Sequence, residues 1–409
     1  MFPPLKEQLD LIKKNTVEII PEGELEKKLS DSIKNKRQLI IKLGCDPSRP
    51  DLHIGHSIVL QKLRDFQDLG HKIILIVGDF TGMIGDPSGR NKTRPTLTLE
   101  ETRINGKTYV EQATKILSTK NLEIRYNSEW LDAMKFSDVI KLASHYTVAR
   151  ILERDDFEKR FNKDEPISLH ELLYPLSQAM DSVAIKSDVE LGGTDQKFNL
   201  LVGRDIQQAY NMEPQVIITC ELLEGTDGVE KMSKSMNNSI NFTDSPKDIF
   251  GKTMSIPDSL IYKYFKLCTH IDTTELAKIK STLEDKKTNP RDLKVRLGYE
   301  LVKKYYDESS AREAQDEFEK IFVKKGIPED IETLTISFDK AKILTDLITN
   351  SGLSDSNSNS RRLIQQGAVQ IDGVKYTEWN LSMNRFLNRP LILKVGKMKF
   401  KKVIINSLT

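Results

Sequence analysis

The chain has 409 residues, more than one ordinary domain needs, so we expect two or three domains and a substantial apolar core. Its 62 lysines and arginines nearly balance 60 aspartates and glutamates, and 38% of the residues are hydrophobic, which excludes disordered and collagen-like chains. The longest strongly apolar run, residues 73–77, is far shorter than the roughly 18 residues of a membrane-spanning helix. The N-terminus shows no signal-peptide pattern, so we expect a cytoplasmic protein with no membrane partner.

The three cysteines, Cys45, Cys220 and Cys268, lie far apart and include no Cys-x-x-Cys pair. This spacing predicts neither a disulfide framework nor a zinc site. We therefore expect no tightly bound protein metal.

The charge is distributed unevenly along the chain. Residues 341–409 carry 11 lysines and arginines against 4 aspartates and glutamates, so the rest of the chain is slightly acidic. A basic C-terminal domain predicts a polyanionic partner. A merely solvated basic tail is the simpler interpretation of charge alone.

In chain order, residues 38–43 read as a short buried strand, residues 57–69 as a helix that ends at Gly70, and residues 72–77 as a second strand. Strand, helix and strand within about forty residues form a βαβ unit, which implies a parallel sheet with ligands at the carboxyl ends of the strands. The loop after the first strand therefore lies where a nucleotide would bind.

Further candidate strands are residues 122–126 and 216–219, and a long helical stretch precedes the second of them. We therefore predict an α/β fold: a doubly wound, Rossmann-type catalytic domain over residues 1–225, with a helical insertion at about 91–188. A helical, charge-rich domain follows over residues 226–330.

The basic segment, residues 341–409, begins with a helical pattern at 343–348. Residues 354–360 are Ser, Asn and Asp only; we interpret them as a polar turn and helix N-cap before Arg361, with Gly367 as the stop, rather than as a disordered linker. Short β signals at 369–371 and 391–395 complete a small α+β domain.

The sequence His53-Ile-Gly-His56 lies between the first loop and the first helix. There both imidazoles and the unpaired amides of the helix start can face an anion, and Gly55 permits close approach of the backbone. Two surface histidines are the alternative. The position after the first parallel strand favours a nucleotide site.

Residues 231–235, Lys-Met-Ser-Lys-Ser, place Lys231 and Lys234 on a hydroxyl-rich loop after a Gly-rich approach. Such a loop can close over a polyphosphate, where lysines add positive charge as a pyrophosphate leaves. A generic Lys-x-x-Lys segment is more often a solvated turn.

Together these two motifs are the diagnostic pair of class I aminoacyl-tRNA synthetases. Four segments narrow the match, since they resemble those of bacterial tyrosyl-tRNA synthetases: 44–56 (GCDPSRPDLHIGH), 78–90 (GDFTGMIGDPSGR), 174–181 (YPLSQAMD) and 192–196 (GGTDQ). The resemblance runs from about residue 42 to the C-terminus. It is least distinctive over residues 284–339.

Tyr174, Gln178 and Asp181 are spaced by four and three residues, so on a helix they form one polar stripe. An ordinary solvent-facing helix side is the alternative, but apolar neighbours indicate a buried setting. Pro175 adds a possible kink. Such a stripe can surround a small polar ligand.

The resemblance implies roles for individual residues. Asp181 would accept the phenol proton of tyrosine, while Tyr174, Gln178 and Asp86 would hold its ammonium group and Gln196 its carboxylate. The implied catalytic residues are His53, His56, Lys231 and Lys234. The implied ATP-binding residues are Gly44, Asp46, Ser48, His53, Gly55, His56, Gly193, Asp195, Lys231, Ser233 and Lys234.

One departure concerns Lys42 and Leu43. The better-known branch of the family has Tyr and Cys at these positions, which contact the substrate phenol and the ATP ribose. This chain resembles the other bacterial branch, with Lys-Leu-Gly in the first loop. The sequence therefore does not identify the residue that makes the second contact to the phenol.

Residues 352–373 resemble an S4-like RNA-binding module, and Arg361 and Arg362 on its basic helix would contact tRNA phosphates. The resemblance thus implies a tyrosine–tRNA ligase with L-tyrosine, ATP and tRNA(Tyr) as partners, Mg²⁺ on the ATP phosphates and a homodimer formed through the insertion. A tryptophanyl-type synthetase and a non-catalytic RNA-binding protein are the alternatives.

Overall fold

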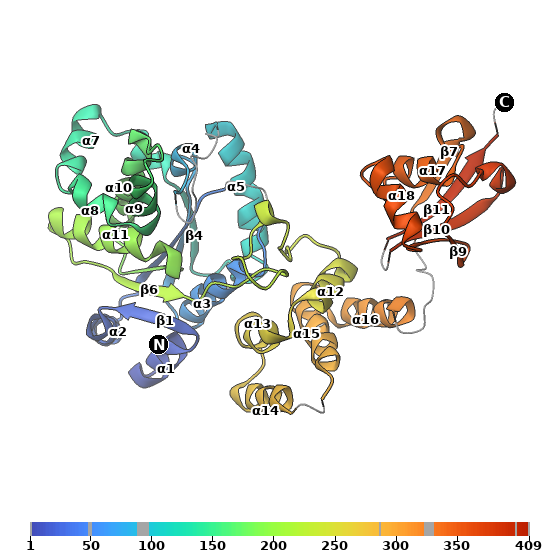
Figure 1. The fold of residues 1–409 in the computed structure, drawn as a ribbon. Helices are drawn as coiled ribbons and strands as arrows, with labels where there is room; N and C mark the ends of the chain where they lie inside the picture. Colours follow the sequence, from blue (N-terminus) through green and yellow to red (C-terminus); the bar gives the residue numbers. More distant parts are fainter. Residues whose placement is uncertain are drawn as a thin grey trace. The chain divides into compact units, whose positions relative to one another are not determined.

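A computed structural model of the chain describes residues 2–47, 51–87, 98–285, 288–322, 331–396 and 399–407. Within these residues the chain divides into two compact units, Met1–Gln315 and Asp316–Thr409. Each unit has its own sheet (Figure 1). None of the helices in the described ranges is long and apolar enough to cross a membrane.

The first unit is built on a six-stranded sheet in the order β1-β6-β5-β2-β3-β4. All neighbouring strands are parallel except β1, which pairs antiparallel with β6 at one edge. The chain order reverses between β2 and β5, so the sheet has a topological switch point there. The strands are β1 (Thr16–Ile20), β2 (Ile40–Cys45), β3 (Lys72–Val77), β4 (Leu122–Tyr126), β5 (Val189–Gly193) and β6 (Val216–Cys220).

Helices cover both faces of this sheet, because the central strands are apolar on both sides. On β3, Ile74 and Ile76 pack with Ile185 on one face, while Leu75 and Val77 point to the other. Figure 1 shows α7 to α11 on one side of the strands and α3 and α5 on the other. The helices are α1 (Leu5–Lys13), α2 (Glu22–Asn35), α3 (His56–Asp68), α4 (Thr81–Ile84), α5 (Leu99–Ala113), α6 (Ser128–Leu131), α7 (Phe136–Ala143), α8 (Val148–Leu152), α9 (Asp155–Asn162), α10 (Leu169–Ile185) and α11 (Lys197–Ala209).

The expected fold class is confirmed, with two differences in detail. The edge strand β1 and the inner strand β5 were not predicted, and β1 makes the sheet mixed rather than wholly parallel. The expected insertion at 91–188 contains β4, which pairs with β3 and so belongs to the sheet. Between β4 and β5 the chain forms only helices, α6 to α10.

After β6 the chain forms the loop that carries Lys231 and Lys234 and then a helical segment. Apolar side chains such as Phe250 and Leu297 form the core between these helices, and both are essentially unexposed. The helices are α12 (Pro246–Ser255), α13 (Ile261–Cys268), α14 (Thr273–Glu284), α15 (Pro290–Tyr305) and α16 (Glu308–Phe322).

The second unit has a five-stranded sheet in the order β7-β11-β10-β8-β9, with two helices packed beside it. A turn at Asp372 and Gly373 joins β8 and β9, and both residues have positive φ, as a tight hairpin requires. A domain that began at residue 341 would leave β7 out of this sheet; the three-domain division stays a prediction. The elements are β7 (Thr333–Ser337), α17 (Leu344–Asn350), α18 (Asn357–Gln365), β8 (Val369–Ile371), β9 (Val374–Tyr376), β10 (Pro390–Val395) and β11 (Lys399–Asn406).

Candidate active site

A cleft of about 970 Å³ opens where β2, β5 and β6 end, at the switch point of the sheet. Ser48 lies outside the described residues, and Arg361 and Arg362 belong to the second unit. Every other predicted site residue lines this cleft: Gly44, Asp46, His53, Gly55, His56, Asp86, Tyr174, Gln178, Asp181, Gly193, Asp195, Gln196, Lys231, Ser233 and Lys234.

The two histidines lie against each other at the start of α3, with ring centroids 3.8 Å apart. His56 Nδ1 accepts a hydrogen bond from the His53 backbone N–H at 3.1 Å, which places the ring proton of a neutral His56 on Nε2. A Cβ on Gly55 would lie 3.0 Å from His53 Nδ1. Any other residue at this position would therefore require the imidazole to shift. His53 Nδ1 has no hydrogen-bond partner among the described residues.

Both imidazoles are held neutral. Burial, followed by repulsion from Lys231, lowers the pKa of His56 to about 4. Burial and the neighbouring His56 lower the pKa of His53 well below its ordinary value. The histidines can therefore offer polar N–H groups to an anion at neutral pH, while the full positive charges come from the lysines.

The loop lysines reach across the cleft to carboxylates. Lys231 Nζ forms an ion pair with Asp195 at 2.5 Å, and Lys234 is ion-paired with Asp51 of the first loop. Asn238 fixes the base of the loop, since its side chain accepts from the Ser233 backbone N–H at 2.8 Å and donates to Asp227 at 2.7 Å. Within the described part of the chain, the loop thus has a fixed base, and its two lysines are held by one ion pair each.

At the other end of the cleft, a chain of hydrogen bonds links three strand ends. Tyr174 donates its hydroxyl proton to Asp46 at 2.8 Å, and Thr81 donates to the second oxygen of the same carboxylate at 2.6 Å. Asn127 then donates to Thr81 at 3.0 Å. A Cβ on Gly78 would lie 2.1 Å from Asp46 Oδ1, so the network requires glycine there.

Asp181 lies at the buried end of this network and is 3% exposed. Trp130 Nε1–H donates to one of its oxygens at 3.0 Å, and Asn127 lies 3.4 Å from the other. Burial raises the pKa of Asp181 to about 7, although the nearby Lys42 opposes this rise. The site therefore offers a weakly acidic carboxyl group that a ligand hydroxyl can reach.

A second network joins Asp86, Gln196 and Gln178 through Asn199. Gln196 donates to Asp86 at 2.9 Å, and Asn199 donates to the side-chain oxygens of Gln196 and Gln178 at 3.0 and 3.1 Å. Arg154, which precedes α9, forms an ion pair with Asp86 at 3.2 Å. These contacts hold two amides and a carboxylate at fixed orientations around one part of the cleft.

Asn127, Trp130, Arg154 and Asn199 were not predicted. Asn127 follows β4 directly, and the rule that ligands bind at the carboxyl ends of parallel strands could have indicated it. Arg154 and Asn199 carry no such signal, because each lies in a helical region and reaches the cleft only through the tertiary fold. Lys42 does not line the cleft.

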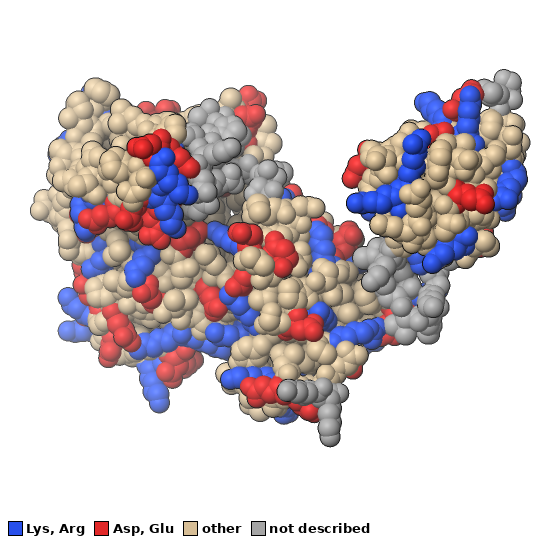
Figure 2. Space-filling model, viewed as in Figure 1, with Lys and Arg blue, Asp and Glu red and all other residues tan. Residues whose placement is uncertain are grey.

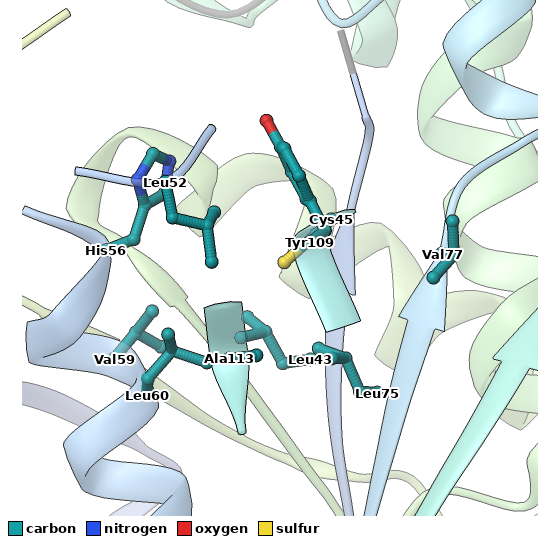
Figure 3. A pocket seen from close by; sticks show the side chains of 10 residues that line it. All are labelled: Leu43, Cys45, Leu52, His56, Val59, Leu60, Leu75, Val77, Tyr109 and Ala113. Atoms are coloured by element: carbon teal, nitrogen blue, oxygen red, sulfur yellow. The ribbon is translucent and has the colours of Figure 1, made fainter. Parts of the chain in front are cut away.

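A small apolar hollow of about 20 Å³ adjoins the cleft between β2, α3 and α5. Figure 3 shows His56, Leu52, Tyr109 and Cys45 around it. Burial raises the pKa of the Cys45 thiol to about 12, so Cys45 is no nucleophile at neutral pH. All three cysteines are free thiols.

No group of three or more His, Cys, Asp or Glu side chains placed to hold a metal ion occurs in the described part of the chain.

In the second unit, Arg361 and Arg362 are exposed on α18. Arg361 lies over the ring of Trp379 at 4.5 Å, and Arg362 bonds to Asn359 at 2.9 Å. Figure 2 shows Lys and Arg side chains spread over the visible face of this unit. The unit therefore presents cations and an aromatic ring on one surface.

A sequence model of the family described as tRNA synthetases class I (W and Y) matches residues 34–323. A second model, the tyrosine–tRNA ligase SYY-like C-terminal domain, matches residues 322–403. The fold is similar to that of tyrosyl-tRNA synthetase from Archaeoglobus fulgidus, solved with L-tyrosine, with a TM-score of 0.62, 23% identity, and coverage of 76% of this chain and 100% of that chain.

Two relatives are similar over nearly their whole length. The tyrosine–tRNA ligase of Chlorobaculum tepidum is 55% identical over 98% of both chains, and that of Salinibacter ruber is 52% identical over 98% of this chain and 97% of its own. The chain therefore belongs to the class I tRNA synthetases and, within them, to the tyrosine–tRNA ligase family.

Proposed function

We propose that the cleft joins L-tyrosine to tRNA(Tyr) in two steps. A carboxylate oxygen of tyrosine attacks the α-phosphorus of MgATP, the bond to the bridging β-phosphate oxygen breaks, and pyrophosphate leaves. A hydroxyl of the terminal tRNA ribose then attacks the carbonyl carbon of tyrosyl-adenylate, and AMP leaves. Neither step needs a covalent enzyme nucleophile, so catalysis would rest on positioning and charge stabilisation.

One observation carries this proposal: Asp181, a buried carboxyl group, shares a cleft with the paired histidines and the loop lysines. A carboxylate held by Trp130 and Asn127 is suited to accept the proton of a phenol. Phenylalanine would bring no hydroxyl to this buried carboxylate, and so would be rejected. The tryptophanyl alternative is disfavoured by the relatives, which are tyrosine–tRNA ligases at 55 and 52% identity.

The ammonium group of tyrosine fits between Tyr174, Gln178 and Asp86. Because Tyr174 donates its own proton to Asp46, its oxygen is left to accept from the ligand. Asp86 adds the negative charge, and Gln196 is placed to hold the tyrosine carboxylate. The same networks that fix these side chains would therefore pre-organise the amino acid for attack.

The nucleotide would bind along the remaining wall of the cleft. Gly44, Gly55 and Gly193, which line the cleft, would allow close approach of the backbone, Asp195 would bind the ribose hydroxyls, and the histidine N–H groups would donate to the phosphates. Lys231 and Lys234 would exchange Asp195 and Asp51 for the departing pyrophosphate. The Mg²⁺ ion belongs to the substrate MgATP and would neutralise the same oxygens.

Amino-acid-dependent exchange of pyrophosphate into ATP, without tRNA, tests the first step in the purified protein. Exchange should occur with tyrosine and with no other standard amino acid. Exchange with tryptophan would overturn the substrate assignment, and no exchange with any amino acid would favour the non-catalytic RNA-binding alternative.

We also propose that the second unit binds tRNA(Tyr) through phosphate contacts from Arg361 and Arg362, and that the protein works in the cytoplasm. Arg361→Ala/Arg362→Ala should weaken tRNA binding and reduce the slope of log affinity against log salt by about 1 to 2. The control is Lys27→Ala/Lys34→Ala, which removes the same charge from exposed positions on α2. Equal effects of both variants on tRNA binding would contradict the assignment.

A homodimer formed through the helices α7 to α10 is the last part of the proposal. Phe136, Phe161 and Leu169 are 79, 62 and 78% exposed on these helices, and Ile140 and Val148 are also more than half exposed. The helices pack against one another, with α10 contacting α7 and α8, and α8 contacting α9. Exposed apolar side chains gathered on adjacent helices are typical of a protein interface.

Sedimentation equilibrium tests this interface. Phe161→Asp should convert a dimer to a monomer, because the new carboxylate would be buried unpaired in the interface. Ile104→Asp is the matched control, since Ile104 is 59% exposed on α5, away from these helices in the chain. A wild-type monomer, or a Phe161→Asp dimer of unchanged stability, would overturn the proposal.

A further inference from the structure

Beneath the tyrosine end of the cleft lies a buried ion pair. Lys42 on β2 and Glu190 on β5 are direct neighbours across the parallel strands, and Lys42 Nζ lies 2.9 Å from Glu190 Oε1. The two side chains are 0 and 1% exposed. Neither residue lines the cleft.

The pair is bonded to the helix that carries the tyrosine site. Lys42 Nζ donates to the backbone oxygen of Gln178 at 3.0 Å and to Ser182 Oγ at 2.8 Å, so its three N–H donors have three acceptors. Glu190 in turn accepts from the Gln178 side chain at 3.2 Å and from Ser182 at 3.0 Å. Both charges therefore hold the same turn of α10.

A buried ion pair of this kind contributes little net stability to the fold, because removing two charges from water offsets most of their attraction. Apolar residues of similar volume often stabilise a fold equally well. The specific contribution of the pair is that it orients the groups around it. It fixes both the backbone and the side-chain amide of Gln178, between Tyr174 and Asp181 on the same helix. An apolar pair could fill the space but could not orient an amide.

We propose that Lys42, paired with Glu190, is a positioning residue that sets tyrosine recognition from below the pocket without touching the substrate. The lysine found where the better-known branch has a phenol-contacting tyrosine thus acts on Gln178 and α10 and makes no contact with the phenol. This inference rests on the proposed tyrosine site. It assigns a role to the ion pair that substrate contacts alone would not reveal.

The test uses the full-length protein and pyrophosphate exchange with tyrosine or ATP as the varied substrate. Lys42→Met alone would leave Glu190 buried without its cation and destabilise the fold. Lys42→Met/Glu190→Gln removes both charges at nearly constant volume. It should raise KM for tyrosine about tenfold while KM for ATP and kcat change by less than about twofold.

Lys62→Met/Asp65→Asn is the matched control. Lys62 is also a buried lysine, 2.9 Å from Asp65, but its other bonds go to the backbone oxygens of Leu11 and Lys14 rather than to α10. This control should leave KM for tyrosine within about twofold of wild type. A similar rise in both double variants would show a general loss of rigidity and overturn the proposal.

Ser182→Ala is a second variant that leaves no charge unpaired. It removes one acceptor of Lys42 and one donor to Glu190, and should raise KM for tyrosine in the same direction but less. Thermal unfolding of each variant confirms that it is folded. Unchanged tyrosine KM in Ser182→Ala and the Lys42 double variant would overturn this inference, whereas absence of tyrosine-dependent exchange in the wild type would overturn the proposed function itself.

Discussion

At the tyrosine end of the cleft, Asp181 and Tyr174 are 3 and 5% exposed and are held by hydrogen bonds to side chains that follow β2 and β4. At the phosphate end, the side chains of Lys231 and Asp195 are 53 and 21% exposed and are held by one ion pair. The first arrangement cannot adapt without breaking a buried network. The second can exchange partners, because exposed ion pairs contribute little stability.

This difference matches what each end has to do. Selection of one amino acid requires donors and acceptors that stay in place when a wrong ligand enters, and buried networks provide that. Stabilisation of a leaving pyrophosphate requires cations that move from protein carboxylates to substrate oxygens during the reaction. In the proposed reaction, specificity and catalysis are thus separated within one cleft, and mutations at the two ends should have separable effects.

The largest effect is expected at the phosphate end. Lys234→Ala should slow tyrosyl-adenylate formation by about 10² to 10³, because its charge acts mainly in the transition state. The equilibrium affinity for tyrosine should stay unchanged, since Lys234 has no bond to the tyrosine network. Single-turnover adenylate formation and equilibrium dialysis measure the two quantities. Equal losses of the adenylate-formation rate and of the tyrosine affinity would contradict the proposed difference between the two ends.

A smaller effect is expected at the tyrosine end, and it should concern the recognition of tyrosine. Asp181→Asn should lower kcat/KM for tyrosine by about 10- to 100-fold, the usual range for loss of a hydrogen bond to a charged group. The rate with phenylalanine should fall much less, so discrimination between the two amino acids narrows. Pyrophosphate exchange with each amino acid checks this. An unchanged ratio between the rates with tyrosine and with phenylalanine would show that Asp181 does not recognise the phenol.

The framework of both ends was predictable from the sequence for a physical reason. Strand β3 is buried on both faces, so it appears as an unbroken apolar run, and its bounds were predicted as they occur. Strand β5 was missed because it ends in Gly192 and Gly193, which indicate a turn when read locally. Strand β1 was missed because a short edge strand depends on its partner more than on its own sequence.

The motif residues were brought together because each follows a strand end or begins a helix, and the sheet places these positions at one edge. The supporting residues were not predictable in this way. Lys42, Glu190 and Arg154 are charged, and charged residues are normally expected at the surface. Only the tertiary fold shows that Lys42 meets a helix 136 positions away in the sequence and that its partners Glu190 and Ser182 are buried.

The smallest effect is a pH dependence that distinguishes the two ends. Because burial raises the pKa of Asp181 to about 7, its carboxylate form should be lost as pH falls through 7, and kcat/KM for tyrosine should fall up to about tenfold between pH 8 and pH 6. Lys42 and Glu190 are the charged groups that act on Asp181 from β2 and β5. His56 cannot produce this limb, because its pKa is lowered to about 4. The profile of Asp181→Asn should therefore be flat from pH 6 to 8, and a limb near pH 7 that persists in this variant would assign the titration to another group.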